Sequence, residues 1–537
     1  MPDFDVVVIG SGFGGAITAC RLAEAGYKVL ILERGRRWEV KDYPRRPGDD
    51  AWVWDQNNPA KYNGWIDLRL FPKMGVALGA GVGGGSLIYA NVSIDAKCDL
   101  FKQGWPPEIT YDELKPYYAK VATMLNVQQV PEGQWSERAR LVREGADEAG
   151  YGDRHFSRLD LAVEFDPSWS YNLQDPHDTQ HSKKVSRDID GDLRIEQGTC
   201  VHLGNCLIGC DVKAKNTLDL NYIPLSEARG AKVRALHIAR CIAPEAGGYR
   251  VRYDRIINGS LQAGSATCGI VIVAAGSLGS TELLLRCRDE FRTLPKLSQS
   301  LGQKWSGNGD FLTPAVYRDR RIFPSRGPTI SVAIDFLGDK NLHGNHFLIE
   351  DGGFPDLLRN WIEAKETESG GRKRHAYLPR LFKSILQCNG GLDAVMPWFG
   401  SGRDAANGRL SLRRRWWLWG EKALHLDWRS RESEKTISAI IDMHKDLAKK
   451  TGGKALVPLS RYVVSPHPLG GCKMGTAIEN GVVDHKGEVF GYENIFVADG
   501  AIIPKAIGAN PSKTIGALAE RIAQKIIDLR RGKRFGE

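Results

Sequence analysis

The segment from residue 5 to residue 35, DVVVIGSGFGGAITACRLAEAGYKVLILERG, constrains the fold more than any other part of this chain. A buried strand runs directly into a glycine-rich turn, and an apolar helix follows. Gly10 permits the tight turn, Gly12 lets the backbone approach a pyrophosphate, and Gly15 lets the helix pack closely on the strand. The phosphate charge would then lie at the positive N-terminus of the helix. The pattern predicts a β-α-β unit that binds a dinucleotide.

An acidic residue stands where such a unit contacts ribose. The second strand, 29–32, ends at Glu33, roughly 20 residues after the glycines. A carboxylate there accepts a hydrogen bond from a ribose 2′-hydroxyl and repels a 2′-phosphate. A glycine motif alone is a weak signal, but here the strand, the helix and the acidic residue agree. We therefore expect an adenine dinucleotide without a 2′-phosphate.

Length and composition limit the classes of protein to which this chain can belong. The chain has 537 residues. A single hydrophobic core does not extend over a chain of this length, so at least two domains are expected. No apolar run reaches the roughly 18 residues that a transmembrane helix needs. The first strand begins too early for a signal peptide to precede it. These features predict a cytoplasmic protein.

The chain is basic, with a net charge of +10. Its positive clusters, 372–374 and 413–415, are short and scattered, and no nucleic-acid-binding module accompanies them. We therefore expect no nucleic-acid partner. A basic face attracts anionic lipid or an acidic redox protein, so peripheral contact with a membrane stays open.

Several segments predict elements beyond the first unit. Residues 79–86, GAGVGGGS, predict a loop whose backbone N–H groups can cradle phosphate or approach a flat ring. Residues 231–276 alternate like a β-meander and end in a second strand–glycine–helix junction. Residues 313–455 predict an antiparallel sheet, with Asn407-Gly408 as a hairpin turn and 431–451 as an amphipathic helix.

Three of the ten cysteines lie close together in a glycine-rich stretch, TCVHLGNCLIGCDVKAKN. They are Cys200, Cys206 and Cys210. A cytoplasmic chain does not use cysteines as a disulfide framework. Two interpretations stay open. The three residues are either reduced structural thiols or ligands of a metal centre, since thiolates are the standard ligands of iron–sulfur clusters.

The C-terminal part carries candidate chemistry. His467, in SPHPLGGCKMG, lies in a rigid turn, and histidine is the most frequent general base near neutral pH. Asn510 precedes Pro511, which fixes it in extended backbone with both a donor and an acceptor to offer. Asp499, at the end of a strand, and a helix that starts near Ser512 could contact a cofactor.

These motifs together resemble the glucose–methanol–choline (GMC) oxidoreductase family, and most closely its cholesterol-oxidase-like branch. The shared segments are the first β-α-β unit, GAGVGGGS, VIVAAGSLGSTELLL, HPLGGCKMG and ADGAIIPKAIGANPSKTI. The resemblance implies an α/β FAD-binding Rossmann-like domain, of the p-hydroxybenzoate-hydroxylase type. It also implies a second, α+β substrate domain built on an antiparallel sheet. The expected FAD-binding domain comprises 1–100, 200–312 and 462–537, and the substrate-binding domain comprises 101–199 and 313–461.

The resemblance also implies site residues for oxidation of an alcohol by hydride transfer to flavin. His467 corresponds to the active-site base and Asn510 to the residue that positions the substrate oxygen. Glu350, in HFLIEDGGFP, lies where cholesterol oxidases keep an active-site glutamate, although a strand-end carboxylate is an equally good interpretation. Tyr89 replaces an asparagine of the cholesterol oxidases, which argues against sterol specificity. The expected FAD contacts are Gly10, Gly12, Phe13, Gly14, Gly15, Glu33, Arg34, Gly79, Gly83, Gly84, Gly85, Ser86, Ala275, Gly276, Asp499, Gly500, Asn510, Pro511 and Ser512.

The electron acceptor and the substrate stay open at this point. With an empty cysteine segment, reduced flavin would pass its electrons to dioxygen. With a three-iron, four-sulfur cluster at Cys200, Cys206 and Cys210, an arrangement that resembles bacterial glucose dehydrogenases, the acceptor would be a cytochrome or quinone. A photodecarboxylase-like lyase is a further alternative within the family. The tryptophan-rich span 413–428 favours a bulky apolar alcohol, whether sterol, long-chain or aromatic.

Overall fold

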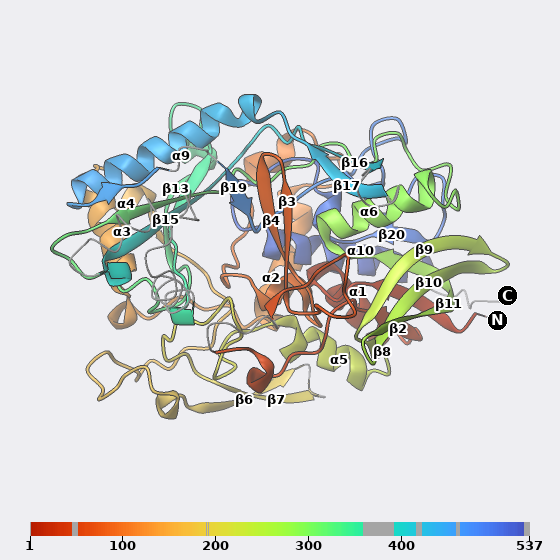
Figure 1. Ribbon diagram of the computed structural model, residues 1–537, viewed down its shortest axis with the longest axis horizontal. Coiled ribbons are helices and arrows are strands. Elements are labelled where there is room, and N and C mark those ends of the chain that lie inside the picture. The colour runs from red at the N-terminus through yellow and green to blue at the C-terminus, as the bar shows by residue number, and fades with distance from the viewer. Residues whose placement is uncertain are drawn as a thin grey trace, which may run out of the picture.

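The computed structural model describes residues 2–45, 52–189, 191, 193–357, 391–414, 422–457 and 462–530. Two large sheets dominate it (Figure 1). One has seven strands and carries both chain ends at its outer side, and the other has six strands and lies at the opposite end of the molecule. An α/β dinucleotide-type unit beside an antiparallel sheet is the fold class that the sequence predicts.

The seven-stranded sheet has the strand order β8-β2-β1-β11-β10-β9, with β20 on β11. Its first unit is the predicted one, because β1 pairs in parallel with both β2 and β11. The predicted meander 231–276 is also confirmed, as antiparallel β9, β10 and the first half of β11. The strands are β1 (Phe4–Ile9), β2 (Val29–Leu32), β8 (Lys232–Arg234), β9 (His237–Glu245), β10 (Gly248–Ile257), β11 (Ser260–Val273) and β20 (Ile495–Val497).

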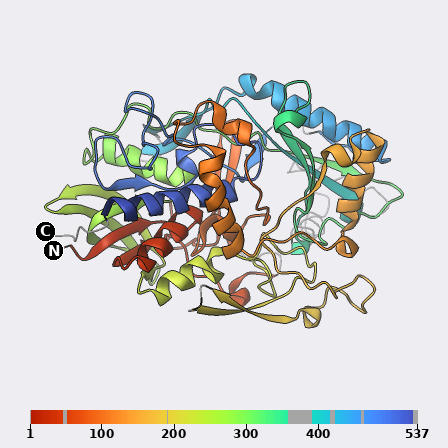
Figure 2. The ribbon, with the colours of Figure 1, turned by 180° about the vertical axis from the view of Figure 1, so that it is seen from behind.

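Helices pack around this sheet, and α1 lies between α5 and α10 (Figure 2). Helix α2 has a capped N-terminus, because the Thr110 hydroxyl accepts the N–H of Glu113 at 3.1 Å. Helix α6 follows β11 directly and packs against β9. The helices are α1 (Phe13–Glu24), α2 (Tyr111–Met124), α5 (Tyr222–Ala228), α6 (Gly276–Asp289) and α10 (Ser512–Arg530). Among the described residues, no helix has the length and apolar character to cross a membrane.

The six-stranded sheet is antiparallel, with the order β18-β12-β15-β14-β13-β5. Helices α9 (Ser430–Lys450) and α3 (Glu137–Glu148) pack on one of its faces, and α9 confirms the amphipathic helix expected over 431–451. A Cβ on Gly400 would lie 2.5 Å from the Ile440 side chain of α9, so this sheet and helix are in close contact. The strands are β5 (Phe156–Arg158), β12 (Phe311–Val316), β13 (Val332–Phe336), β14 (Phe347–Asp351), β15 (Val395–Gly402) and β18 (Lys454–Ala455).

Smaller elements connect the two sheets. The sheet β19-β4-β3 spans the middle of the molecule (Figure 1). The remaining elements are β3 (Ile66–Phe71), β4 (Met74–Gly79), β19 (Val463–Ser465), β6 (Lys184–Ile189), β7 (Leu193–Gly198), β16 (Arg409–Arg414), β17 (Lys422–Asp427) and α4 (Gly152–His155).

The hairpin turn predicted at Asn407-Gly408 is wrong. Strand β16 pairs with β17, which follows it, while Gly408 forms a bridge with Trp305. The dipeptide therefore joins strands of different sheets. The tryptophans of the 413–428 span at positions 416, 417 and 419 lie outside the described residues.

The two glycine-rich loops touch each other through their backbones. A Cβ on Gly84 would lie 2.5 Å from the Cα of Gly12, and Gly84 has a φ of +53°. The N–H of Gly83 donates to the Ser11 hydroxyl at 3.1 Å. The loop 79–86 is therefore held against the dinucleotide turn, and only a residue without a side chain fits at the contact.

We predict that Gly84→Ala lowers the free energy of unfolding by about 1–3 kcal/mol, because the added methyl overlaps backbone that cannot move aside. Gly133→Ala is the matched control, since its Cβ would meet no described atom within 4 Å. Urea unfolding of both variants measures the difference. Equal stability of the two variants would contradict the close contact.

Candidate functional site

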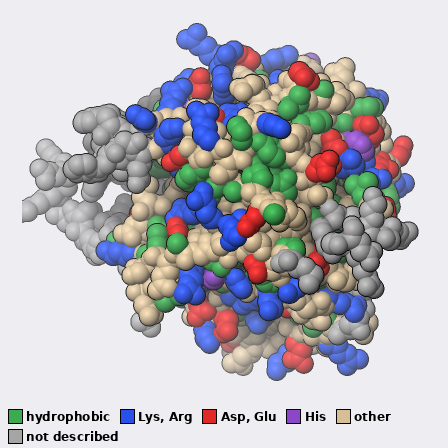
Figure 3. Space-filling view, turned by 90° about the vertical axis from the view of Figure 1, so that its right-hand side faces the viewer, with side chains coloured by type: hydrophobic (Ala, Val, Ile, Leu, Met, Phe, Trp, Pro, Cys, Tyr) green, Lys and Arg blue, Asp and Glu red, His purple; other side chains and the backbone are tan. Residues whose placement is uncertain are grey.

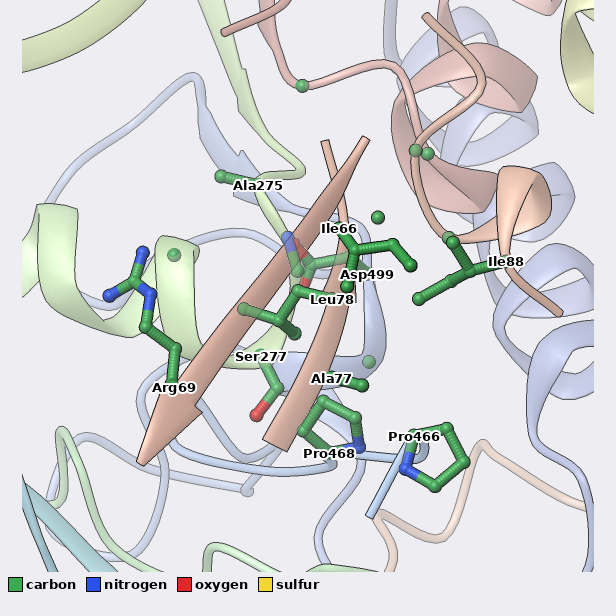
Figure 4. Close-up of a pocket in the computed structure, with 18 of the residues that line it drawn as sticks. Ile66, Arg69, Ala77, Leu78, Ile88, Ala275, Ser277, Pro466, Pro468 and Asp499 are labelled. Carbon is green, nitrogen blue, oxygen red and sulfur yellow. The ribbon is translucent and has the colours of Figure 1, made fainter. Parts of the chain in front are cut away.

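One large cavity of about 1240 Å³ lies between the two sheets and beneath the β3–β4 hairpin. It exceeds the roughly 300–1,000 Å³ of an ordinary small-molecule pocket, so it has room for a dinucleotide and a substrate. Figure 4 shows Ala77 and Leu78 of β4 in front, with Ala275 and Asp499 behind them. Pro466 and Pro468, the neighbours of His467, lie below Ala77 and Leu78 in this view.

The turn before α1 is shaped for a pyrophosphate. Gly12 is the N-cap of α1, and no side chain within the described ranges caps this helix. The first backbone N–H groups of the helix therefore have no intrahelical partner. A Cβ on Gly12 would come no closer than 3.9 Å to a described atom, whereas one on Gly14 would lie 2.2 Å from the Ala498 carbonyl oxygen. The site can thus receive an anion at Gly12, while Gly14 holds α1 against the end of β20.

Glu33 is fixed at the end of β2. Its Oε2 accepts the N–H and the hydroxyl of Ser11 at 3.0 and 2.6 Å, and its Oε1 accepts the N–H of Gly35 at 3.0 Å. Burial raises the pKa of Glu33, and the hydrogen bonds from Ser11 and Gly35 oppose that rise. The carboxylate that was predicted to contact ribose is therefore oriented by Ser11, a residue the sequence analysis did not single out.

A chain of ion pairs crosses the cavity from the first unit to α6. Arg34 pairs with Asp67 at 2.6 Å, Asp67 with Arg69 at 2.9 Å, and Arg69 with Glu282 at 3.2 Å. Burial would raise the pKa of Asp67, but Arg34 and Arg69 lower it overall. Because Asp67 and Arg69 lie on β3 and Glu282 on α6, the pairs tie the β3–β4 hairpin over the dinucleotide end of the cavity. Arg34 was predicted, but its partners were not.

Asp499 joins the end of β20 to the start of α6. Its carboxylate accepts the N–H of Gly276 at 2.7 Å, the Ser280 hydroxyl at 2.5 Å and the N–H of Ala501 at 2.8 Å. Burial raises its pKa, and the hydrogen bond from Ser280 is the largest opposing influence. Asp499 therefore lines the cavity while it also holds two junctions in place.

His467 is oriented by a buried carboxylate. Its Nδ1 lies 3.0 Å from Oδ1 of Asp310, which also accepts the hydroxyls of Ser401 and Ser465 at 3.0 and 2.8 Å. Nδ1 donates to this carboxylate, so Nε2 is the nitrogen that can accept a proton. Asp310 directly precedes β12, and a single acid at the start of a strand gives no periodic signal. The sequence analysis therefore missed it.

Asn510 offers a buried acceptor to the cavity. Its side chain is 5% exposed, and among the described residues its Oδ1 has no hydrogen-bond partner. Asn308 holds the preceding backbone, because its Oδ1 accepts the N–H groups of Ile507 and Gly508 at 3.0 and 2.8 Å and its Nδ2 donates to Ala509 at 2.9 Å. An unpaired buried acceptor is costly, so a ligand that donates to Asn510 fits this structure.

Glu350 lies on β14, just behind the cavity wall. It is fully buried and outside the lining, but its cross-strand partner Phe399 lines the cavity, so both side chains point to that face of the sheet. Within the described part of the chain, neither carboxylate oxygen has a well-formed hydrogen bond. Burial raises the pKa of Glu350 well above its usual value, nearby Asp310 raises it further, and the Asn510 amide opposes this. The structure thus brings Glu350 next to Asn510, in surroundings that favour the neutral form of its carboxyl group.

Most of the predicted FAD contacts share this one cavity. Gly15, Gly83 and Ser86 lie outside the lining and support it instead. A Cβ on Gly15 would lie 2.0 Å from the Gly10 carbonyl oxygen, and the Ser86 hydroxyl donates to Gly83 at 2.7 Å. The lining includes Gly10, Gly12, Phe13, Gly14, Glu33, Arg34, Gly79, Gly84, Gly85, Ala275, Gly276, Asp499, Gly500, Asn510, Pro511 and Ser512.

The structure does not support an iron–sulfur centre at the three clustered cysteines. Cys200, Cys206 and Cys210 are free and partly buried. Across the described ranges, no group of three or more histidine, cysteine, aspartate or glutamate side chains has a geometry that could hold a metal ion. Burial, reinforced by Cys206 and Cys210, raises the pKa of Cys200 well above its usual value.

Comparison with known proteins identifies the family. The family model for GMC oxidoreductases matches residues 404–519, and a model for an NAD(P)-binding Rossmann-like domain matches residues 8–39. A cholesterol oxidase of Mycobacterium tuberculosis is 31% identical over 97% of this chain and 91% of its own length. A cholesterol oxidase of Acinetobacter baumannii is 27% identical over 97% of this chain and 93% of its own length.

A solved structure shares the fold. The crystal structure of pyridoxine 4-oxidase from Mesorbium loti superposes with a TM-score of 0.62 at 16% identity, covering 97% of this chain and 98% of that one. This similarity extends over nearly the whole chain and therefore includes both sheets. The chain belongs to the GMC oxidoreductase family, and it is an FAD-dependent enzyme that acts on the CH–OH group of its donor.

Proposed function

We propose that this enzyme oxidises a bulky apolar alcohol and uses dioxygen as the electron acceptor. The observation that carries the proposal is His467, whose Nε2 is left free by the Asp310 contact, on the same cavity as the unpaired Oδ1 of Asn510. A base and a hydrogen-bonding amide at one site suit a substrate that must lose a hydroxyl proton.

The dinucleotide end of the cavity is the proposed FAD site. The N-terminus of α1 would hold the pyrophosphate, and Glu33 the ribose. When bound, FAD supplies the acceptor for the hydride that leaves the alcohol carbon. We further propose that the chain divides into an FAD-binding domain (1–100, 200–312 and 462–537) and a substrate-binding domain (101–199 and 313–461).

The residues of this chain then have distinct roles. His467 Nε2 accepts the hydroxyl proton, while Asp310 keeps the ring in the required tautomer and stabilises the imidazolium that forms. Asn510 hydrogen-bonds the substrate oxygen and sets its distance from the base. Glu350, as a neutral acid beside Asn510, is a positioning residue behind the wall.

The wall around the substrate end is apolar, which supports the proposed substrate class. Leu312 and Pro314 of β12, Phe399 of β15 and Val464 of β19 line this part of the cavity. Leu312 is opposite Phe399 in the sheet, so their side chains form one continuous surface. Dioxygen is preferred as acceptor because the clustered cysteines lack the geometry of a metal site.

The direct test supplies the purified holoenzyme with alcohols of increasing apolar size under air. We expect oxygen uptake and hydrogen peroxide release in equal amounts with alcohol oxidised. We expect kcat/KM to rise about fourfold for each added methylene that the wall buries, since each contributes about 0.8 kcal/mol. Turnover that needs an artificial dye, together with iron in the protein, would reject the oxidase in favour of the dehydrogenase alternative.

We predict that His467→Ala retains FAD but slows its reduction by the alcohol about 10²–10⁴-fold, because the proton acceptor is lost. Anaerobic stopped-flow absorbance measures this rate in a single turnover. His181→Ala is the matched control, since His181 lies on the short 3₁₀ helix Thr179–His181, outside the cavity lining, and its Nε2 is 2.8 Å from the Gln174 carbonyl oxygen. A normal rate in His467→Ala would remove His467 from the proposal.

The raised pKa of Glu350 predicts that the stability difference between Glu350→Gln and the parent protein depends on pH. The folded state raises its pKa, so the folded protein holds a proton that the unfolded chain releases, and stability falls as pH rises above the unfolded value of about 4.3. Glu350→Gln keeps the shape and removes this loss. Its stability relative to the parent, measured by urea unfolding, should therefore increase from pH 5 to pH 8. A difference that stays constant with pH would show that Glu350 ionises normally in the folded protein.

A further inference from the structure

Two thiols meet at the contact between β9 and α6, away from His467. Cys241 lies on β9 and Cys287 on α6, and both are buried and free. The N–H of Ile242, next to Cys241, donates to the Cys287 sulfur at 3.3 Å. The Thr293 hydroxyl contacts both residues, since it lies 3.4 Å from the Cys241 sulfur and 3.5 Å from the Cys287 carbonyl oxygen. The two thiols therefore lie close enough for each to shift the pKa of the other.

A guanidinium and a hydroxyl complete the surroundings of Cys241. Nη2 of Arg252 donates to its sulfur at 3.1 Å, and the Thr293 hydroxyl lies 3.4 Å away. The hydrogen bond from Cys287 lowers the pKa of Cys241 most; burial opposes the shift, and Thr293 and Arg252 reinforce it. The same hydrogen bond raises the pKa of Cys287. These surroundings favour the thiolate form of Cys241 and the thiol form of Cys287.

A β-bulge between β9 and β10 lies directly beside Cys241. Arg252 of β10 is opposite Cys241, but the next residue, Tyr253, is opposite Ala239, so Arg240 is the extra residue on β9. Side chains that are directly opposite lie on one face of a sheet. A bulge re-aims side chains, and bulges are frequent at functional sites. The break in register at Arg240 is what places the Arg252 guanidinium on the Cys241 sulfur.

The pair lies just below the surface. The Arg252 guanidinium lies 5.6 Å from the centre of the Phe291 ring, and Phe291 is 41% exposed. Figure 3 faces this end of the molecule and shows apolar side chains among Lys and Arg. The Cys241 sulfur itself is nearly buried, but it is in contact with Arg252, whose side chain reaches the surface.

We propose that Cys241 and Cys287 form a disulfide in response to hydrogen peroxide, and that this pair is a modification site separate from the alcohol site. The Cys241 thiolate attacks the peroxide, an S–O bond forms, and the O–O bond breaks with release of hydroxide. Cys287 then gives up its proton and attacks the Cys241 sulfur; the S–S bond forms and the S–O bond breaks. In total, two thiols and one peroxide yield one disulfide and two waters.

The bond would join two walls of the cofactor cavity. Residues 237–240 of β9 line the cavity, and so does α6 through Gly276, Ser277, Glu282 and Arg286. Hydrogen peroxide is also the product expected of the proposed oxidase. The reaction at the thiols needs no alcohol, however, so it can be tested with peroxide added from outside.

The test treats the holoenzyme with hydrogen peroxide, blocks the remaining thiols by alkylation and analyses the peptides by mass spectrometry. We expect a peptide pair linked through Cys241 and Cys287, and its loss after reduction with dithiothreitol. At pH 7 an ordinary thiol is only about 3% ionised, so a full thiolate gains up to about thirtyfold in rate, partly offset by its lower nucleophilicity. Cys241 should therefore react about tenfold faster than exposed Cys98. Cys268, whose pKa burial raises to about 12, should stay reduced.

Variants separate this chemistry from unspecific oxidation. In Cys287→Ser, which keeps the size of the side chain, dimedone should label Cys241 as a sulfenic acid, with no disulfide formed. Arg252→Gln should slow oxidation of Cys241, whereas Arg250→Gln, on the same strand but paired with Glu245, should not. The proposal is overturned if Cys241 reacts no faster than Cys98, or if the two arginine variants behave alike. Loss of alcohol oxidation with an intact disulfide response would instead reject the proposed function alone.

Discussion

The contact between Gly12 and Gly84 is the constraint on which the rest of this molecule depends. It is made by backbone against backbone, and it brings a loop from residues 79–86 onto the turn of the first β-α-β unit. Gly10 and Gly14 make similar close contacts with Ala274 and Ala498. Four segments that are distant in sequence therefore converge where no side chain intervenes. The cavity exists because these segments are held at this separation.

Ion pairs between charged side chains hold the other elements around the cavity in place. Asp67 and Arg69 on β3 connect Arg34 to Glu282, so the hairpin over the dinucleotide end is tied down at both sides. Buried ion pairs of this kind contribute little net stability but fix a geometry. Asn510 and Glu350 differ from these pairs, because among the described residues neither the Asn510 Oδ1 nor the Glu350 carboxyl oxygens have a well-formed hydrogen bond.

The sequence predicted the local parts of this structure well. The first unit, the meander and α9 follow from short-range periodicity, whereas the roles proposed for His467 and Asn510 rest on motifs and stay predictions. Asp310 was missed because its role depends on a contact with a residue 157 positions away, which no local pattern encodes. The same holds for Asp67 and Glu282.

Two interpretations show why local signals fail. The Asn407-Gly408 dipeptide favours a tight turn but does not specify which strands it joins. The three clustered cysteines have a suggestive spacing, yet spacing along the chain does not determine whether sulfur atoms converge. Cys241 and Cys287, with 45 residues between them, show the opposite case, because the packing of α6 against β9 brings them together.

Residues 306–310 connect the two groups proposed for the chemistry. Asn308 holds the backbone before Asn510, Asp310 holds His467, and Ser306 forms a two-way bridge with Leu469. One short segment thus acts as a template that sets the spacing of base and amide. The apolar wall is built from other residues, chiefly on β12 and β15. Substitutions in the apolar wall can therefore change which substrate fits, while residues 306–310 keep His467 and Asn510 at the same spacing and the reaction stays the same.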